Sequence, residues 1–204
     1  DTCNGEKTCF SFSARAARDA SIVTGTKAVS TNLELLSAAR RARPNAIILY
    51  KPHPDVEAGL RKGLIEKDDL AELCDLVLHK SDSIAAIEAV DEVWTMTSLL
   101  GFEALLRDKP VTCLGTPFYA GWGLTNDLGA VPARRSLQIS LESLVHATLI
   151  DYPRYFDPIT KLACPAEVVL ERLATGTLPK PGSFNRITAK LQGLFASKAH
   201  LWRR

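Results

Sequence analysis

Three polar motifs each follow a short apolar run, and their residue types suit the binding of a phosphorylated ligand. The first is Lys51-Pro-His-Pro54, directly after the apolar run 46–50. The two prolines restrict the backbone around His53 and prevent a helix from beginning there. A rigid histidine at a strand end can contact a phosphate as a cation or as a neutral donor, and Lys51 adds a positive charge. The alternative is a proline-stiffened turn with a solvated histidine.

The second motif opens a predicted helix, 97–106, directly after the apolar run 93–96. Thr97 and Ser98 offer hydroxyls where free backbone N–H groups can bind a phosphate. Glu103 lies further along the helix and could accept hydrogen bonds from ribose hydroxyls. Gly101 lowers helix stability, which indicates a close approach by a ligand or by backbone. The alternative is a simple helix cap followed by a solvated glutamate.

The third motif is the loop Pro117-Phe-Tyr-Ala-Gly-Trp-Gly123, after the apolar run 111–114. Aromatic residues between glycines in a loop are poor core material and good contacts for a sugar or a base. We therefore predict that Tyr119, Gly121 and Trp122 contact a sugar. A surface loop that packs on itself is the alternative.

The elements that must position these motifs alternate regularly between about residues 20 and 115. Ser30 or Thr31 can cap a helix that ends before Pro44. Strands alternating with helices predict an α/β fold, a Rossmann-like doubly wound parallel sheet. Ligands bind at the carboxyl ends of such strands, so all three motifs should meet at one edge. The predicted strands are 46–50, 76–78, 93–96 and 111–114, and Phe10–Phe12 could begin another.

Beyond the turn-rich stretch 115–129 the alternation stops, and the segments 141–149, 166–173 and 187–202 are predicted to be helical. The last of these has an apolar stripe and a basic end, which suits either an anionic membrane surface or packing on the domain itself. The predicted organisation is an atypical segment 1–18, a nucleotide-sugar-binding domain 19–135, a helical extension 136–178 and a basic amphipathic helix 179–204.

Composition excludes several classes of protein. The net charge of +2 is too small to argue for a nucleic-acid partner. Five cysteines without CxxC spacing indicate neither a zinc site nor a disulfide framework, and a reducing cytoplasm fits them best. Clustered acidic residues of a metal site are absent from the sequence, as are a secretory signal and an apolar run of about 20 residues.

Longer stretches around these motifs resemble one family, the capsule polysaccharide export and biosynthesis proteins. The resemblance runs from about Asp19 to about Leu173, and it is strongest to the second module of the two-module β-Kdo transferase. It implies one half of a GT-B architecture, with the acceptor-binding half absent or supplied by another chain. The stretches that carry it are Tyr50–Gly59, Thr97–Leu106, Pro117–Thr125 and Ala147–Thr160.

The resemblance also implies a chemistry: CMP-β-Kdo as donor, retention at the anomeric carbon, and no metal or other cofactor. Asp19, which by itself would be a turn or cap residue, falls where the family has its proposed nucleophile. His53 falls at the motif that contacts the CMP phosphate, and Thr97, Ser98 and Glu103 fall on the nucleotide-binding helix. Lys51 and Gly101 complete the predicted nucleotide site.

The implied acceptor is a lipid-linked saccharide, which places the protein in the cytoplasm at the inner membrane. Two alternatives remain open at this point. One is a transferase that uses another CMP-activated sugar, and the other is a truncated, inactive nucleotide-binding module.

Overall fold

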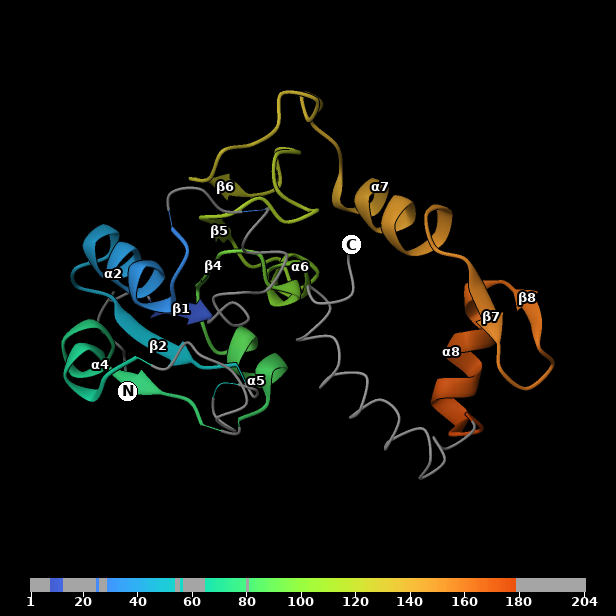
Figure 1. The fold of residues 1–204 in the computed structure, drawn as a ribbon, viewed down its shortest axis with the longest axis horizontal. Helices are drawn as coiled ribbons and strands as arrows, with labels where there is room; N and C mark the ends of the chain where they lie inside the picture. The colour runs from blue at the N-terminus through green and yellow to red at the C-terminus, as the bar shows by residue number, and fades with distance from the viewer. Residues whose placement is uncertain are drawn as a thin grey trace, which may run out of the picture. The chain divides into compact units, whose positions relative to one another are not determined.

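The computed structural model describes residues 8–12, 25, 29–53, 56, 65–79 and 81–178 of the chain (Figure 1). Asp19 and the predicted helix 179–204 lie outside the described residues. The chain forms two compact units, with the boundary between Leu144 and Val145. No helix among the described residues is long and apolar enough to cross a membrane.

The first unit is built on a six-stranded sheet in which every pairing between neighbours is parallel. Phe10 in the central strand is in register with Leu49 on one side and with Val93 on the other. From one edge to the other the strands are β3 (Leu76–Val77), β2 (Ile47–Lys51), β1 (Thr8–Phe12), β4 (Glu92–Thr95), β5 (Val111–Cys113) and β6 (Asn126–Asp127). The order reverses between β1 and β4, which makes this the switch point of a Rossmann-like sheet.

The fold class predicted from the sequence is confirmed. The four predicted strands 46–50, 76–78, 93–96 and 111–114 agree with β2, β3, β4 and β5 to within one residue at each end. The central strand β1 contains the run Phe10–Phe12, where a strand was expected to begin.

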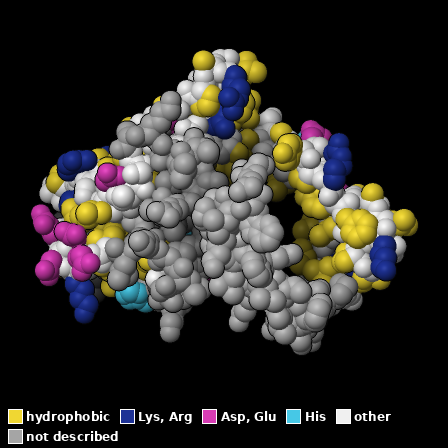
Figure 2. Space-filling view, viewed as in Figure 1, with side chains coloured by type: hydrophobic (Ala, Val, Ile, Leu, Met, Phe, Trp, Pro, Cys, Tyr) yellow, Lys and Arg dark blue, Asp and Glu magenta, His cyan; other side chains and the backbone are white. Residues whose placement is uncertain are grey.

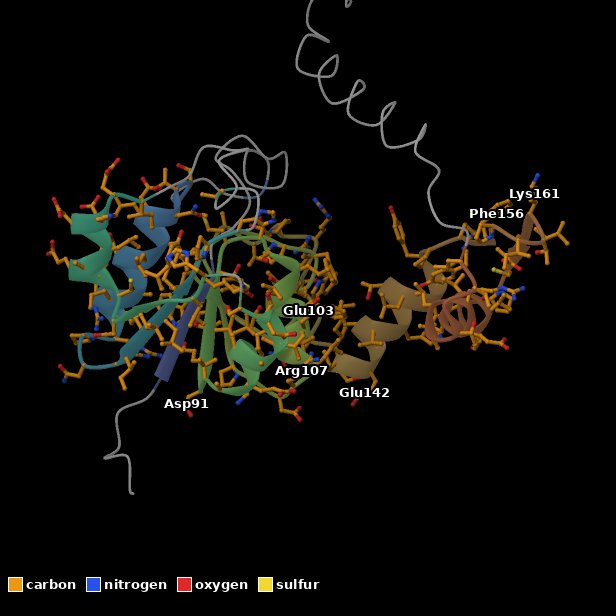
Figure 3. The ribbon with its side chains drawn as sticks, turned by 90° about the horizontal axis from the view of Figure 1, so that it is seen from below. Asp91, Glu103, Arg107, Glu142, Phe156 and Lys161 are labelled. Carbon is orange, nitrogen blue, oxygen red and sulfur yellow. The ribbon has the colours of Figure 1, made fainter. Side chains whose placement is uncertain are left out.

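Helices cover both faces of the sheet (Figure 3): α2 (Asn32–Ala42) and α4 (Lys67–Leu73) lie on one face, and α5 (Ser83–Glu88) and α6 (Leu99–Leu105) lie on the other. The apolar side of α2 is fully buried against strand residues that include Ile48 and Trp94. Burial of this kind, at about 25 cal/mol per Å² of apolar surface, is the main stabilising contribution to the domain.

A capping box fixes the start of α2. The Thr31 hydroxyl accepts a hydrogen bond from Glu34 N at 3.2 Å, and the Glu34 carboxylate accepts one from Thr31 N at 3.0 Å. The backbone N–H of Ser30 also donates to this carboxylate at 2.7 Å and lowers the pKa of Glu34. Thr31 is therefore the cap, as one of the two candidates from the sequence.

The second unit contains a hairpin that the sequence analysis did not predict. After α7 (Leu141–His146) and the π-helix η1 (Ala147–Asp151), the strands β7 (Tyr155–Asp157) and β8 (Leu162–Cys164) pair antiparallel before α8 (Ala166–Thr175). The expected helices at 141–149 and 166–173 are present. The stretch between them, expected to belong to a purely helical extension, forms the hairpin instead.

A buried carboxylate holds the hairpin to α8. Asp157 is 1% exposed and accepts hydrogen bonds from Ile159 N, from the Thr160 hydroxyl and from the Arg172 guanidinium, all between 3.0 and 3.1 Å. The bond from Arg172 is the largest cause that lowers the pKa of Asp157, to about 2.

Candidate functional site

A cavity of about 610 Å³ lies at the carboxyl-terminal edge of the parallel sheet. Its walls come from the segments that follow β1, β4, β5 and β6, at the switch point between β1 and β4. This edge is where open α/β sheets bind ligands, because the loops that leave the strands diverge there. The lining residues are Gly25, Thr97, Thr116, Pro117, Phe118, Ala130, Val131, Pro132, Arg134 and Arg135.

Hydrogen bonds join the segments that line this cavity. Thr116 N donates to Gly25 O at 2.7 Å, and the Thr116 hydroxyl donates to Ala130 O at 3.0 Å. A β-carbon on Gly25 would lie 3.1 Å from Thr97 Cγ2, so a larger residue there would crowd the wall. Gly129 permits a closer approach still, since a β-carbon there would lie 2.8 Å from the carbonyl oxygen of Gly115.

The start of α6 is capped from within the protein. Ser98 is the N-cap residue, and its hydroxyl accepts a hydrogen bond from Leu100 N at 3.3 Å. Ser98 N donates to the Thr95 hydroxyl at 3.3 Å, and the Tyr119 hydroxyl donates to Ser98 O. Of the two predicted phosphate contacts, Thr97 lines the cavity, whereas the Ser98 hydroxyl acts as a cap.

A side chain of the protein itself explains why position 101 is a glycine. A β-carbon at Gly101 would lie 2.2 Å from the Tyr119 hydroxyl oxygen and 3.0 Å from Thr95 Cγ2. The sequence had indicated a close approach by a ligand or by backbone. The close approach is made by the tyrosine ring of the loop after β5.

Tyr119 is a core residue, which corrects the prediction that it contacts a sugar. Its side chain is 0% exposed, with its ring centroid 6.3 Å from that of Phe102 and 5.2 Å from that of Phe118. Burial raises the pKa of the Tyr119 hydroxyl well above its ordinary value. A ring without exposed surface cannot stack on a ligand, so Tyr119 instead fastens the loop to α6.

The rest of this loop is held by a second set of contacts. Gly121 has φ +83°, a conformation that favours glycine, and its N–H donates to the Asp127 carboxylate at 2.8 Å. Trp122 is half-buried, and its indole N–H donates to Phe118 O at 2.8 Å. The Arg135 guanidinium lies 5.6 Å from the centroid of the Trp122 ring. Gly121 and Trp122 do not line the cavity. No other observation tests their predicted sugar contacts, which stay predictions.

The first sequence motif reaches the same edge, two strands away from β4. Lys51 is only 3% exposed, and its ammonium donates to Ser81 O at 2.7 Å and to the Ser81 hydroxyl at 3.2 Å. The ammonium therefore holds the turn after β3 and does not line the cavity. His53 is half-buried, and the spacing of about 4.8 Å between strands places the ends of β2 and β4 about 10 Å apart.

Glu103 is half-buried on α6, beside Arg107 in Figure 3. Arg107 donates to the Glu103 carbonyl at 2.9 Å and reaches the Glu88 carboxylate of α5 at 3.7 Å. Glu103 is not among the residues that line the cavity, so its predicted contact with a ribose stays a prediction. The predicted nucleophile, Asp19, lies outside the described residues.

Sequence reasoning missed one side of the cavity, the segment between β6 and α7. Figure 2 shows Lys and Arg side chains beside hydrophobic ones over this segment. Arg134 and Arg135 supply the basic groups there, and Ala130, Val131 and Pro132 the apolar ones. The only signal in the sequence was the Arg-Arg pair itself. In the described part of the chain, no group of three or more His, Cys, Asp or Glu side chains could hold a metal ion.

Comparisons with known proteins agree on one family. Residues 3–155 match the family described as "Capsule polysaccharide biosynthesis protein". The chain is 48% identical over 168 residues to "Capsule polysaccharide modification protein LipA" of Neisseria meningitidis serogroup A, covering 82% of the chain and 24% of that protein. It is 46% identical over 137 residues to "Lipopolysaccharide-processing protein LpsZ" of Rhizobium meliloti, covering 67% of the chain and 31% of that protein. The chain thus spans about a quarter to a third of the length of these relatives.

Solved structures show the same relationship in three dimensions. The fold is similar to that of Thermosulfurimonas dismutans KpsC described as "beta Kdo 2,7 transferase", with a TM-score of 0.75 and 39% identity, covering 87% of this chain and 56% of that one. A second KpsC structure, described as "beta Kdo 2,4 transferase", matches with a TM-score of 0.71 and 30% identity, over 84% of this chain and 53% of that one. The chain belongs to the capsule polysaccharide biosynthesis family.

Proposed function

We propose that this chain is the donor-binding part of a glycosyltransferase that transfers Kdo from CMP-β-Kdo in capsule polysaccharide biosynthesis. The observation that carries the proposal is the cavity of about 610 Å³ at the switch-point edge of the sheet. It lies in a chain that shares 39% identity and a TM-score of 0.75 with a solved β-Kdo transferase. Nucleotide ligands of Rossmann-like sheets bind at this edge.

The walls of the cavity suit a nucleotide sugar. Hydroxyls of Thr97 and Thr116 can hydrogen-bond a phosphate or a sugar, and the apolar side chains of Phe118 and Val131 offer a surface for a base or sugar ring. Arg134 supplies a positive charge at the same wall. His53 lies on the same edge beyond β1, so an extended ligand in the cavity would have to cross the end of β1 to reach it.

We assign the chemistry on the family resemblance. The Asp19 carboxylate would attack the anomeric carbon of Kdo, forming a glycosyl-enzyme bond while the bond to CMP breaks and CMP leaves as the anion. His53 and Thr97 would stabilise the charge on the departing phosphate. The hydroxyl of a lipid-linked saccharide acceptor would then form the new glycosidic bond, regenerate the Asp19 carboxylate and release its proton to solvent. Two displacements at the same carbon give net retention.

Calorimetry with CMP tests the binding part of this proposal. Wild-type chain should bind CMP more tightly than UMP or GMP, and His53→Ala should weaken CMP binding by about tenfold, since a hydrogen bond to a charged group contributes about 1.5–3 kcal/mol. The matched control is His79→Ala, an exposed histidine that follows β3, one strand further from the cavity. Absence of CMP binding by the wild type would overturn the proposal. An equal loss of CMP affinity in His79→Ala would show that His53 has no specific role in binding.

A donor comparison addresses the sugar. In an assay that also contains an acceptor-binding half of the transferase, CMP-Kdo should be consumed much faster than CMP-sialic acid. The reverse preference would indicate a transferase for a different CMP-activated sugar. Binding of CMP without consumption of either donor would indicate an inactive nucleotide-binding module.

A further inference from the structure

Two neighbouring arginines at the cavity wall have different environments. Arg135 is used within the protein: its guanidinium donates to Pro117 O at 2.6 Å and to Ala120 O at 2.7 Å, and it faces the Trp122 ring. Arg134 is exposed, and within the described residues it makes no hydrogen bond or ion pair. The cavity therefore has one cation built into its wall and another that is available to a ligand.

The backbone that carries Arg134 is held in place. Arg135 N donates to Pro132 O at 2.9 Å, which closes a turn with Arg134 inside it. The contacts of the Arg135 side chain tie this turn to the loop after β5. Arg134 thus projects from a fixed backbone, which lowers the entropic cost of holding a ligand.

The charges around the cavity favour an anion. Burial, followed by repulsion from Arg134, lowers the pKa of Arg135, so the two positive charges are close enough to interact. The carboxylate of Asp127 acts on Arg135 in the opposite direction, and it accepts hydrogen bonds from the Gly121 N–H at 2.8 Å and from the Thr125 hydroxyl at 2.7 Å. Most other lining residues are apolar, and charges attract more strongly beside apolar walls than in water.

We propose that Arg134 binds an oxyanion of the ligand in this cavity, the phosphate of the nucleotide or the carboxylate of an acidic sugar. The inference deepens the proposed function and rests on it for the identity of the ligand. A guanidinium can hold either group through two parallel hydrogen bonds. Arg135 is the positioning residue that keeps the turn, and with it Arg134, at the wall.

The test uses the full chain in three variants: Arg134→Gln, Arg134→Lys, and Arg41→Gln as the matched control. Arg41 is an exposed arginine in the last turn of α2 that does not line the cavity, so the control loses the same charge elsewhere. The probes are CMP, neutral cytidine and free Kdo. Their binding to each variant is measured by calorimetry and by NMR titration. Thermal melts of each variant check that the fold is retained.

The expected result is a loss of about tenfold or more in the affinity for CMP or for Kdo in Arg134→Gln, the size expected for a charge-assisted hydrogen bond. Cytidine binding should not change, Arg134→Lys should retain part of the affinity, and Arg41→Gln should retain all of it. A loss confined to CMP assigns the phosphate, and a loss confined to Kdo assigns the carboxylate.

Two results separate the inference from the proposed function. If the wild type binds CMP and Kdo, and Arg134→Gln binds both equally well, the role of Arg134 is overturned while the donor site stands. If the wild type binds Kdo in an Arg134-dependent way but does not bind CMP, the oxyanion site stands and the CMP-sugar assignment fails. Binding of neither probe by the wild type overturns both.

Discussion

For the substitution Gly101→Ala, helix propensity and packing predict opposite changes in the free energy of unfolding. Gly101 lies inside α6, where replacement of glycine by alanine ordinarily stabilises a helix by about 1 kcal/mol. In this chain the new β-carbon would lie 2.2 Å from the Tyr119 hydroxyl oxygen and 2.7 Å from Tyr119 Cζ. The tyrosine must move, although its ring is fully buried.

The magnitude follows from those contacts. Overpacking a rigid core costs about 1–3 kcal/mol, and loss of the hydrogen bond from Tyr119 to Ser98 O costs about 1 kcal/mol more. Subtracting the gain in helix propensity leaves a net destabilisation of about 1–3 kcal/mol in the free energy of unfolding. CMP binding should weaken as well, because the tyrosine fastens the loop that carries Pro117 and Phe118 into the cavity wall.

Urea unfolding of a double-mutant cycle measures this effect. Tyr119→Phe removes the oxygen that the new methyl group would meet, so Gly101→Ala should cost about 1 kcal/mol less in the Tyr119→Phe background than in the wild type. If Gly101→Ala is as stable as the wild type or more stable, the steric account of this glycine is refuted.

Three further predictions concern other parts of the chain. The pKa of Asp157 is lowered from its ordinary value of 3.8 to about 2, so the contribution of this carboxylate to stability is present above pH 4 and lost as the pH falls toward 2. In thermal melts followed by circular dichroism, Asp157→Asn should have a lower melting temperature than the wild type at neutral pH, and the two melting temperatures should converge near pH 2. Burial raises the pKa of Cys113 to about 12, so mass spectrometry after thiol labelling at pH 8 should find Cys164, which is half-buried, modified well before Cys113. The segment 179–204 suits either an anionic membrane surface or packing on the domain, and co-sedimentation with anionic vesicles separates the two. Binding that is lost on removal of residues 183–204 assigns the membrane role, whereas no binding together with a lower melting temperature after the removal assigns packing.

The strands β4 and β5 were predictable because they are buried on both faces. Buried strands form short, mostly apolar runs, such as Val111–Cys113, and these runs stand out from the polar helices between them. The cap at Thr31 was predictable for a similar reason, since a hydroxyl residue before an amphipathic stretch, with a glutamate three residues later, is a local signal.

Elements without such signals were missed. The helix α5 has only six residues, too few to display a period, and its cap Asp82 lies in a polar stretch. The strand β6 consists of Asn126 and Asp127, which have no tendency to form strands alone and pair only because β5 lies beside them. In the turn between β7 and β8, Lys161 has φ +58°, a conformation usually taken by glycine. Because a lysine stands there, the sequence has no glycine to indicate the turn.

The candidate site was predictable in its location and less so in its contacts. The motifs at Lys51, Thr97 and Pro117 do follow strands at one edge, because chain order and parallel topology determine that. The direction of each side chain depends on packing between distant segments. Tyr119 points inward because Gly101 leaves room for it, and Arg134 reaches the cavity wall only because the turn after β6 folds back toward β5.

A crystal structure of the chain with CMP tests the central claim most directly. The account predicts CMP in the cavity between Thr97 and the segment Thr116–Phe118, at the carboxyl edge of β4 and β5. CMP bound at another face of the sheet, with this cavity free of ligand at a saturating concentration, would contradict it.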